Sequence, residues 1–255
     1  MTPTDLFGQQ PPLPLPEVPG YDSHWLEEVR GYRIVVPDGE LVYAQAFLDR
    51  ALADRCVEYF QENDRVDWRT ARWRDVVDPD DLERIVFRNI RWKQDRIRLY
   101  GRTTPLPRLT AWYGDSGRTY TYSGITSTPN EWNDRLLDLK RRVEAVARTR
   151  FNSVLLNWYR DGSDHLGWHA DDEVELGRNP VIASVNFGET RDFVLRRKDD
   201  RTTRLVLPLG HGTLLLMRGA LQHHWEHAVP KRARSTRSRF NLTFRRIIGP
   251  VPASA

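Results

Sequence analysis

Apolar side chains recur along this chain at two spacings, which predict its helices and strands. Residues 44–62 and 130–150 each carry apolar positions three or four residues apart, the pattern of an amphipathic helix with one buried face. Residues 32–36 and 118–124 are short runs with the apolar and alternating character of strands. Further strand-like runs follow at 153–159, 181–187, 192–195, 204–207, 212–217 and 239–246.

The connections between these runs favour a β-rich fold. The short runs are separated by glycine, proline and charged residues, and we interpret residues 112–117 as one of the turns. Many short strands of this kind predict a sandwich or barrel rather than a parallel α/β sheet. The expected fold class is therefore α+β and mainly β, with helices that cover a sheet.

The composition of the chain indicates how large its hydrophobic core can be and in which cellular compartment we expect it. The 255 residues are 39% hydrophobic and include 9 Trp, 9 Tyr and 9 Phe, enough for one large domain with a substantial core. Cys56 is the only cysteine, so an internal disulfide and a cysteine-rich zinc site are both excluded. No apolar run approaches the ~20 residues of a membrane span, and the first residues lack a secretory pattern. We expect a protein of the cytoplasm, or of the nucleus in a eukaryote, without a membrane partner.

Tryptophans and arginines interleave in residues 68–102, a basic–aromatic region whose most basic segment is 88–102. Six arginines and lysines stand there against one aspartate, in a chain whose formal net charge is +4. Arginine beside aromatic residues suits phosphate contact and base stacking, which favours a nucleic-acid partner. The alternative is a solvated strand face whose aromatic residues point into the core, and composition leaves both interpretations open.

His169 and Asp171 are the first candidates for metal ligands. They stand two residues apart, so on an extended strand both side chains lie on one face. Two histidines and one carboxylate form a ligand set that holds Fe(II) and leaves positions open for oxygen and a co-substrate. The third ligand must come from elsewhere, and the candidates in the run 221–227 are His223, His224 and His227.

A pocket for an anion is predicted from residues 239–245. Every second residue of this strand-like run is polar, so these side chains share one face. An arginine that points inward is costly unless an anion pairs with it, and a dicarboxylate co-substrate would provide one. The residues concerned are Arg239, Asn241, Thr243 and Arg245, and Asn157 and Tyr159 share a face in the same way.

Five motifs of this chain occur together in a known family. They are Asn-x-Tyr at 157–159, the run 161–173, Ile-Ala-Ser-Val-Asn-Phe-Gly at 182–188, Trp-Glu-His-Ala-Val-Pro at 225–230 and Arg-x-Asn-Leu-Thr-Phe-Arg at 239–245. In combination they resemble the AlkB family of Fe(II)- and 2-oxoglutarate-dependent dioxygenases, specifically its nucleic-acid demethylases. The resemblance covers roughly residues 98–247. It implies a double-stranded β-helix (jelly-roll) core with flanking helices.

Three regions are expected along the chain. Residues 1–20 read as a proline-rich extended leader, because repeated prolines cannot join the interior of a helix or sheet. Residues 21–110 would form an N-terminal extension that binds nucleic acid, with a helix and a nucleotide-recognition hairpin. Residues 111–250 would form the dioxygenase core. We expect the chain to act as a monomer.

The resemblance implies that His169, Asp171 and His227 bind the iron. The family's last ligand precedes a small–hydrophobic–proline step, which here selects His227. His223 would share its strand face and is the fallback, whereas His224 would point the other way.

The co-substrate site follows from the same resemblance. Arg239 would pair with the distal carboxylate of 2-oxoglutarate, and Arg245 would act near its metal-chelating end. Six residues of strand span ~20 Å, so the two arginines can share a short ligand only by leaning together. The remaining residues expected to hold the co-substrate are Asn157, Tyr159 and Asn241.

Contacts to the nucleic acid are also implied. Tyr122 resembles the aromatic residue that sandwiches the target base against His169, and Asp172 the partner of the exocyclic amine. Tyr100 stands where duplex-specific relatives carry a hairpin aromatic residue that fills the gap left by a flipped base. Arg102 and Arg108 would flank it on phosphates. The full set of expected substrate contacts is Tyr100, Arg108, Tyr120, Tyr122, Ser123, Asp172 and Glu173; ordinary sheet packing is the alternative for Tyr120 and Tyr122.

The function implied is oxidative demethylation of N-alkylated DNA bases of the 1-methyladenine or 3-methylcytosine type. The reaction would use Fe(II), O2 and 2-oxoglutarate and release succinate, CO2 and formaldehyde. The base must be flipped, because its methylated edge is inaccessible inside a duplex. Two alternatives stay open: a related dioxygenase that acts on RNA or protein, and a non-catalytic DNA-binding module whose histidines are structural or hold zinc. A plain zinc site has no use for a neighbouring anion pocket.

Overall fold

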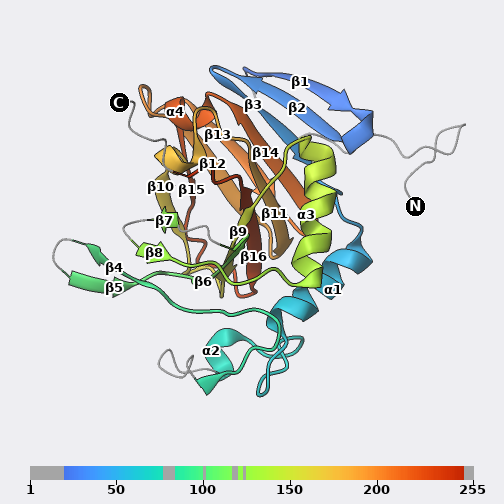
Figure 1. Cartoon of the computed structure of the whole chain (residues 1–255), viewed down its shortest axis with the longest axis vertical. Coiled ribbons are helices and arrows are strands. Elements are labelled where there is room, and N and C mark those ends of the chain that lie inside the picture. The colour runs from blue at the N-terminus through green and yellow to red at the C-terminus, as the bar shows by residue number, and fades with distance from the viewer. Residues whose placement is uncertain (1–19, 77–83, 100–101, 117–119, 123–124, 250–255) are drawn as a thin grey trace, which may run out of the picture.

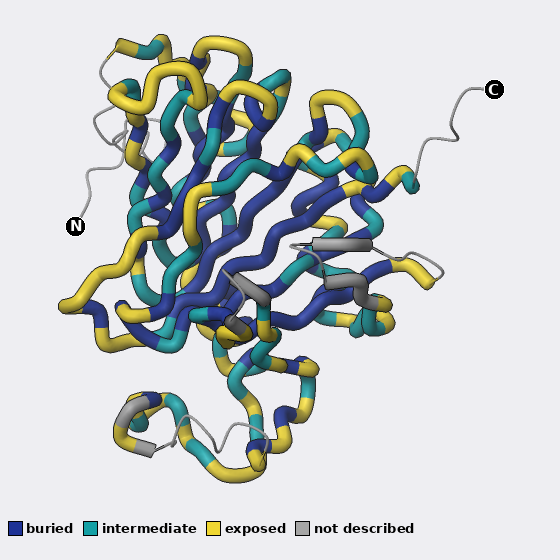
Figure 2. The backbone as a smooth tube through the Cα atoms, turned by 90° about the vertical axis from the view of Figure 1, so that its left-hand side faces the viewer, coloured by how far each residue is buried: buried dark blue, intermediate teal, exposed yellow. Residues whose placement is uncertain are grey.

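Two antiparallel β-sheets face each other in the computed structural model of the chain, and two long helices lie against the outside of the larger sheet (Figure 1). The structure describes residues 20–76, 84–99, 102–116, 120–122 and 125–249. The central strands of the larger sheet are among the most deeply buried segments, whereas many exposed residues lie in the connecting loops (Figure 2). A mainly β fold is therefore confirmed.

The larger sheet has eight strands, and most neighbours within it are distant in sequence. β16 lies between β9 and β11 and pairs antiparallel with both. In spatial order the strands are β1 (Asp22–Leu26), β2 (Gly31–Val36), β3 (Gly39–Ala44), β14 (Thr213–Gly219), β11 (Ile182–Gly188), β16 (Arg239–Arg245), β9 (Ser153–Tyr159) and β6 (Leu109–Gly114).

The smaller sheet has four strands and closes over the inner face of the larger one. Apolar side chains from both sheets, such as Leu215 of β14 and Leu207 of β13, form one buried cluster between them. Two antiparallel sheets packed in this way make the jelly-roll core that was expected. In spatial order the strands are β10 (Leu166–His169), β15 (Trp225–Val229), β12 (Arg191–Arg197) and β13 (Arg204–Leu209).

Helix α1 (Arg50–Gln61) is shorter than the predicted 44–62. The Asp49 side chain accepts a hydrogen bond from the backbone N–H of Leu52 at 2.8 Å, and this cap fixes the first turn at Arg50. Ala44 instead ends β3, because its apolar neighbours belong to a strand of the larger sheet. The helix buries Leu52, Cys56 and Phe60 against the sheet.

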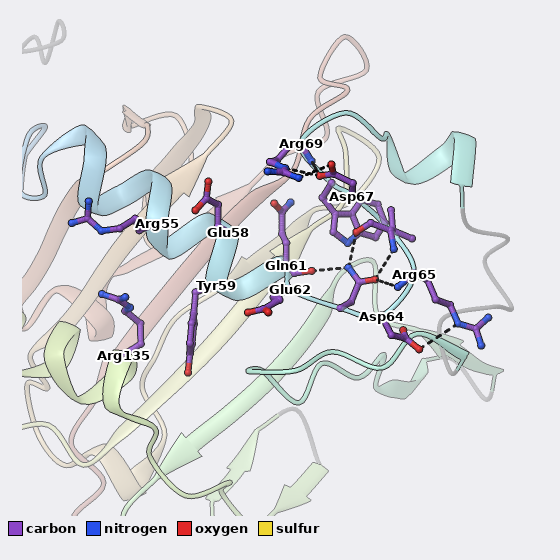
Figure 3. A pocket seen from close by; sticks show the side chains of 13 residues that line it. Arg55, Glu58, Tyr59, Gln61, Glu62, Asp64, Arg65, Asp67, Arg69 and Arg135 are labelled. Atoms are coloured by element: carbon purple, nitrogen blue, oxygen red, sulfur yellow. Dashed lines mark hydrogen bonds and ion pairs between the residues drawn. The ribbon is translucent and has the colours of Figure 1, made fainter.

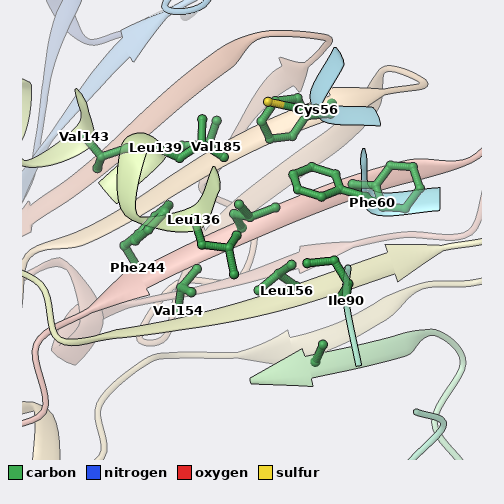
Figure 4. Close-up of a cluster of buried hydrophobic side chains, with 14 of the residues drawn as sticks. Cys56, Phe60, Ile90, Leu136, Leu139, Val143, Val154, Leu156, Val185 and Phe244 are labelled. Carbon is green, nitrogen blue, oxygen red and sulfur yellow. The ribbon is translucent and has the colours of Figure 1, made fainter. Parts of the chain in front are cut away.

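Helix α3 (Asp134–Ala147) lies within the predicted 130–150. Asn133 caps its start by accepting from the N–H of Leu136 at 3.0 Å. The apolar stripe of Leu136, Leu139 and Val143 faces the larger sheet, where it meets side chains of β9, β11 and β16 (Figure 4). Both helices thus cover the outer face of the sheet, and the inner face is left to the site described below.

Strands β9 and β16 present different chemistry on their two faces. Trp158 and Phe240 point to the helix side and are fully buried in the main core. Asn157 and Asn241, one position away on each strand, line a cavity between the sheets. The two-residue period of a strand therefore separates an apolar face from a polar one.

An aromatic cluster surrounds Trp158. Trp68, Trp73 and Trp92 each lie with ring centroids 5.4–5.5 Å from the Trp158 ring, at steep interplanar angles. Trp73 and Trp92 are buried and Trp68 packs against the same core. These tryptophans of the basic–aromatic region are thus core residues, which was the alternative interpretation of that segment.

The remaining elements are short. Residues 112–117 are not a turn throughout, because Trp112 and Tyr113 belong to β6 and pair with β9. No helix among the described residues is long and apolar enough to cross a membrane. The short elements are η1 (Glu27–Val29), α2 (Trp73–Val76), β4 (Arg96–Leu99), β5 (Arg102–Pro105), β7 (Tyr120–Tyr122), β8 (Ile125–Ser127), η3 (Val174–Leu176) and α4 (Leu221–His224).

Candidate functional site

His169, Asp171 and His227 converge between the two sheets. Strands β10 and β15 are antiparallel neighbours, and His169 lies directly opposite His227 in their register. The two imidazole centroids are 4.2 Å apart. Asp171 follows the end of β10, and one potential ligand atom from each of the three residues lies within 4.8 Å of the others. This is the only such group of three among the described residues.

Both imidazoles are expected to be neutral, the form that can bind a metal ion. His169 Nδ1 lies 2.9 Å from the carbonyl oxygen of Gly167, which can only accept, so Nδ1 carries the hydrogen and Nε2 keeps its lone pair. Burial lowers the pKa of His169. Burial, together with the neighbouring His169, lowers the pKa of His227 to about 3. Near neutral pH both rings are uncharged, as metal ligation requires.

Asp171 is a buried carboxylate held by an arginine. Arg245 Nη2 donates to Asp171 Oδ1 at 2.6 Å, and both side chains are buried. Burial alone would raise the pKa of Asp171, but the charge of Arg245 and the nearby histidines outweigh it, so the pKa is lowered. Asp171 Oδ2 is also buried and has no hydrogen-bond partner among the described residues. One carboxylate oxygen is therefore fixed and the other is left for a further partner.

A row of three asparagines crosses the larger sheet beside these residues. Asn157, Asn241 and Asn186 stand opposite one another on β9, β16 and β11. Asn157 Nδ2 donates to Asn241 Oδ1 at 3.2 Å, and Asn241 Nδ2 donates to Asn186 Oδ1 at 3.2 Å. At one end Arg108 Nε donates to Asn157 Oδ1 at 2.8 Å, and at the other Arg239 Nη2 donates to Asn186 Oδ1 at 2.6 Å.

Arg239 brings an uncompensated positive charge into the interior. It is 2% exposed, and its guanidinium carbon lies 4.9 Å from the centre of the Tyr159 ring. Nε and Nη1 are buried without a hydrogen-bond partner among the described residues, and burial lowers the pKa of Arg239. A buried cation with unused donors is costly unless an anion completes it.

These groups fit an iron ion and a dicarboxylate. Two neutral imidazoles and a carboxylate with one unpaired oxygen are the donor set of a non-haem Fe(II) site. The unpaired donors of Arg239 fit a carboxylate group. The ligand group and the arginine line the same cavity, whose walls are Leu155, Asn157, Tyr159, Leu166, His169, Asp171, Ser184, Phe193, Met217, His227, Val229, Arg239, Asn241, Thr243 and Arg245.

The two arginines of β16 take different positions along this cavity. Arg245 pairs with Asp171 at the metal end, whereas Arg239 contacts Asn186. We noted from the sequence that Arg239 and Arg245 could share one short ligand only by leaning together. The structure removes this requirement, because Arg245 pairs with Asp171 of the protein itself.

The prediction for residues 221–224 was wrong. His223 does not share a strand face with His227, because residues 221–224 form the helical turn α4 and β15 begins at Trp225. His223 and His224 are both exposed, and His224 Nδ1 lies 3.7 Å from Asp38 Oδ2. Neither belongs to the group of three ligands.

The expected nucleic-acid contacts are only partly described. Arg108 is 3% exposed and bonded to Asn157, so a surface phosphate contact is contradicted for this residue. Asp172 is exposed and pairs with Lys198 at 2.9 Å, and Glu173 is half-buried. Tyr100 and Ser123 lie outside the described residues, as do the side chains of Arg102, Tyr120 and Tyr122.

A wider hollow lies at the end of α1, apart from the ligand group (Figure 3). Tyr59 and Arg135 meet on one side of it, with the guanidinium carbon 5.8 Å from the ring centre. Several lining charges are already paired, as for Arg69 with Asp67 at 2.8 Å. None of the predicted site residues lines this hollow.

Three residues of the site were not predicted individually. Asn186 and Ser184 both contact Asn241 and lie in β11, within the motif at 182–188. Their alternation with Ala183 and Val185 was a readable signal, because it places two polar side chains on one face of a buried strand. Gln222 accepts from the backbone N–H of Asp171 at 2.9 Å, and no sequence pattern pointed to that contact.

Comparison with known proteins agrees with this geometry. The family model described as "2OG-Fe(II) oxygenase superfamily" matches residues 41–245. "Alpha-ketoglutarate-dependent dioxygenase alkB homolog 3" of Mus musculus is 45% identical over 190 residues, covering 71% of this chain and 65% of that protein. "DNA oxidative demethylase ALKBH2" of Homo sapiens is 46% identical over 160 residues, covering 60% and 61%. The protein of the same name from Arabidopsis thaliana is 40% identical over 188 residues, covering 63% and 60%. The chain thus spans 60–65% of the length of these curated relatives.

Proposed function

Since this chain belongs to the 2OG-Fe(II) oxygenase superfamily, we propose that it is an Fe(II)- and 2-oxoglutarate-dependent dioxygenase that demethylates N-alkylated bases in DNA. One observation carries the proposal: a two-histidine, one-carboxylate group shares its cavity with an arginine whose donors lack partners. That combination matches the ferrous ion and the dicarboxylate co-substrate that such an oxygenase needs.

The ligand residues act by offering donor atoms in fixed positions. His169 Nε2, His227 and Asp171 Oδ2 would hold the iron. Bound Fe(II) and 2-oxoglutarate would supply the oxidation of the methyl group by O2, with release of succinate, CO2 and formaldehyde. Arg245 keeps Asp171 ionised and oriented, since a protonated carboxyl group would be a poor ligand.

The polar face of β9 and β16 orients the co-substrate. Arg239 would pair with its distal carboxylate through the two donors that have no protein partner. Asn186 holds the third guanidinium nitrogen of Arg239. Asn157, Tyr159 and Asn241 would complete the walls, with the asparagine row preventing rotation of each amide.

The substrate class rests on the relatives, two of which carry the name DNA oxidative demethylase. A base of the 1-methyladenine or 3-methylcytosine type would have to be flipped into the site, and a lesion that blocks pairing lowers the cost of flipping. Asp172 and Glu173 follow the ligand Asp171 directly and would meet the polar edge of that base. Tyr100, Tyr120, Tyr122 and Ser123 complete the proposed contacts.

The organisation of the whole protein follows from this activity. Residues 1–20 would be a leader, 21–110 a nucleic-acid-binding extension and 111–250 the oxygenase core. Duplex or single-stranded DNA would be the partner, RNA would be the alternative substrate, and a monomer would be the working unit. Such an activity belongs where the nucleic acid is, in the cytoplasm or in a eukaryotic nucleus.

The decisive experiment compares wild type with Asp171→Ala. Succinate and formaldehyde are measured with Fe(II), 2-oxoglutarate, O2 and an oligonucleotide that carries 1-methyladenine. We expect wild type to release both products and Asp171→Ala to lose at least ~100-fold, because one of three iron ligands is gone. Glu58→Ala, which removes an exposed carboxylate of α1, should leave the rate unchanged.

Two results would contradict the proposal in different ways. Equal turnover in wild type and Asp171→Ala would contradict the proposed metal site. Succinate without formaldehyde on methylated DNA, but with formaldehyde on methylated RNA, would keep the chemistry and replace the substrate.

A further inference from the structure

Gln222 is a buried amide placed against the ligand segment. Helix α4 joins β14 to β15, and its second residue, Gln222, is 1% exposed. Gln222 Oε1 accepts from the backbone N–H of Asp171 at 2.9 Å. The register of β10 with β15 ends at His169, so this N–H has no strand to pair with. A side chain from another segment thus satisfies a buried donor that would otherwise be costly.

The other contacts of Gln222 fix its rotamer and its main chain. Nε2 lies 3.5 Å from Sδ of Met217, which also lines the cavity. The carbonyl oxygen of Gln222 accepts from Lys198 Nζ at 2.9 Å, and the same ammonium group donates to Asp172 Oδ2 at 2.9 Å. Lys198 therefore joins α4 to the residue that follows Asp171.

Asp171 is consequently held at two points. Gln222 fixes its backbone and Arg245 fixes Oδ1, so Oδ2 is the oxygen of this carboxylate that has no hydrogen-bond partner among the described residues. A carboxylate fixed in this way can turn neither about its backbone nor about its side-chain bonds without losing a buried hydrogen bond. The carboxylate is thereby kept in the group whose potential ligand atoms, one from each residue, lie within 4.8 Å of one another.

We propose that Gln222 is a positioning residue for the metal site, which sets the direction of Asp171 Oδ2. The inference rests on the metal site of the proposed function, but not on its substrate. Groups that orient a metal ligand typically change metal affinity 10- to 100-fold when removed. The hydrogen bonds of Gln222 among the described residues go to the Asp171 backbone, Met217 and Lys198, and none goes to a ligand atom or to Arg239, so its effect must pass through Asp171.

The test measures Mn(II) binding to the full-length, metal-free protein, without co-substrate or nucleic acid. Free Mn(II) is followed by electron paramagnetic resonance during titration. Gln222→Met keeps the length of the side chain and removes the acceptor, and we expect its Mn(II) dissociation constant to rise about 10- to 100-fold. Gln222→Glu keeps an acceptor oxygen in the same place and should recover most of the affinity.

Controls separate positioning from loss of fold. Gln94→Met makes the same change at a half-buried amide that donates to Leu106, away from the ligands, and should bind Mn(II) like wild type. The thermal midpoint of each metal-free variant is measured alongside.

Three outcomes overturn the inference. One is equal Mn(II) affinity in wild type and Gln222→Met. Another is a loss of affinity that Gln222→Glu does not recover and that follows the thermal midpoint. A wild type that binds no Mn(II) would remove the metal site itself. By contrast, a specific Gln222 effect in a protein that fails to demethylate DNA would keep this role and reject only the proposed substrate.

Discussion

At the scale of single residues, Arg239 shows a conflict between stability and binding. A buried guanidinium with two unpaired nitrogens costs folding free energy, yet those nitrogens are what a carboxylate needs. The fold tolerates this cost because the surrounding strands supply the main core on their other face.

We expect Arg239→Met to separate the two effects. The KM for 2-oxoglutarate should rise at least ~30-fold, since truncating one partner of a buried charge pair costs about 2–5 kcal/mol. The free energy of unfolding without co-substrate should rise by about 1 kcal/mol or more, because the uncompensated charge is gone. Steady-state kinetics and urea unfolding measure these quantities.

The matched control is Arg141→Met, an exposed arginine of α3, which should change neither quantity appreciably. An unchanged KM for 2-oxoglutarate in Arg239→Met would remove the proposed anion site. A loss of several kcal/mol in stability would instead make Arg239 a structural residue.

Sequence alone identified the residues whose chemistry is rare in an interior. His169 and Asp171 stood out because their spacing places two metal-binding side chains on one face of a strand. Arg239 stood out because an arginine that points inward needs an anion as a partner. Asn186 and Gln222 did not stand out, because the role of a buried amide depends on its hydrogen-bond partner, and these partners lie in segments that are distant in sequence. Arg108 was misjudged for the same reason: nothing in its neighbours along the chain points to Asn157.

At the scale of elements, the end of α3 depends on one carboxylate. Glu144 is 7% exposed and accepts from the backbone N–H of Phe151 at 2.8 Å and from Arg150 at 3.1 Å. Burial alone would raise the pKa of Glu144, but these hydrogen bonds and the charge of Lys140 outweigh it and lower the pKa. The helix is thereby joined to the segment that leads into β9.

Glu144→Gln should reduce the free energy of unfolding by about 1 kcal/mol at pH 7, because hydrogen bonds to a charged group exceed those to a neutral one. Since folding lowers this pKa, the contribution is complete above the ordinary value of 4.5 and is lost as the pH falls through the lowered value. The difference between variant and wild type should therefore shrink below pH 4.5. Urea unfolding at several pH values measures it, and a difference that grew on acidification would contradict the assignment.

Periodicity predicted most elements and failed where context decides. The strands β9, β11 and β16 match the predicted runs closely, because their alternation is set by one polar and one apolar face. Residues 221–224 were read as strand, although the chain forms a helical turn where it passes from β14 of the larger sheet to β15 of the smaller one. The start of α1 was misplaced because the apolar residues before Asp49 belong partly to a strand.

At the scale of the whole molecule, the order of strands could not be read from the sequence alone. β16 lies between β9 and β11, and that neighbourhood depends on pairing over long separations. The resemblance of motifs supplied the jelly roll, while the position of the tryptophan-rich segment in the core came only from the structure.

The net charge of +4 predicts that binding of a nucleic acid depends on salt concentration. Binding of a methylated single-stranded oligonucleotide should weaken roughly 20-fold between about 50 and 200 mM salt if three phosphates are contacted. Binding of 2-oxoglutarate to the buried site should change far less, because buried pairs are screened weakly. Fluorescence anisotropy and calorimetry would measure both, and equal salt sensitivity would contradict a surface-bound polyanion.

The two faces of β16 have a consequence for how such a protein can evolve. Deleting or inserting a single amino acid between Arg239 and Arg245 would exchange the faces downstream, turning Phe244 towards the ligands and an arginine towards α3. Single substitutions can change individual side chains of this strand, but insertions and deletions within it are not tolerated. The polar wall of the cavity and the apolar contacts with the helices depend on the same alternation of residues along β16. A shift in register that changes one face therefore changes the other as well.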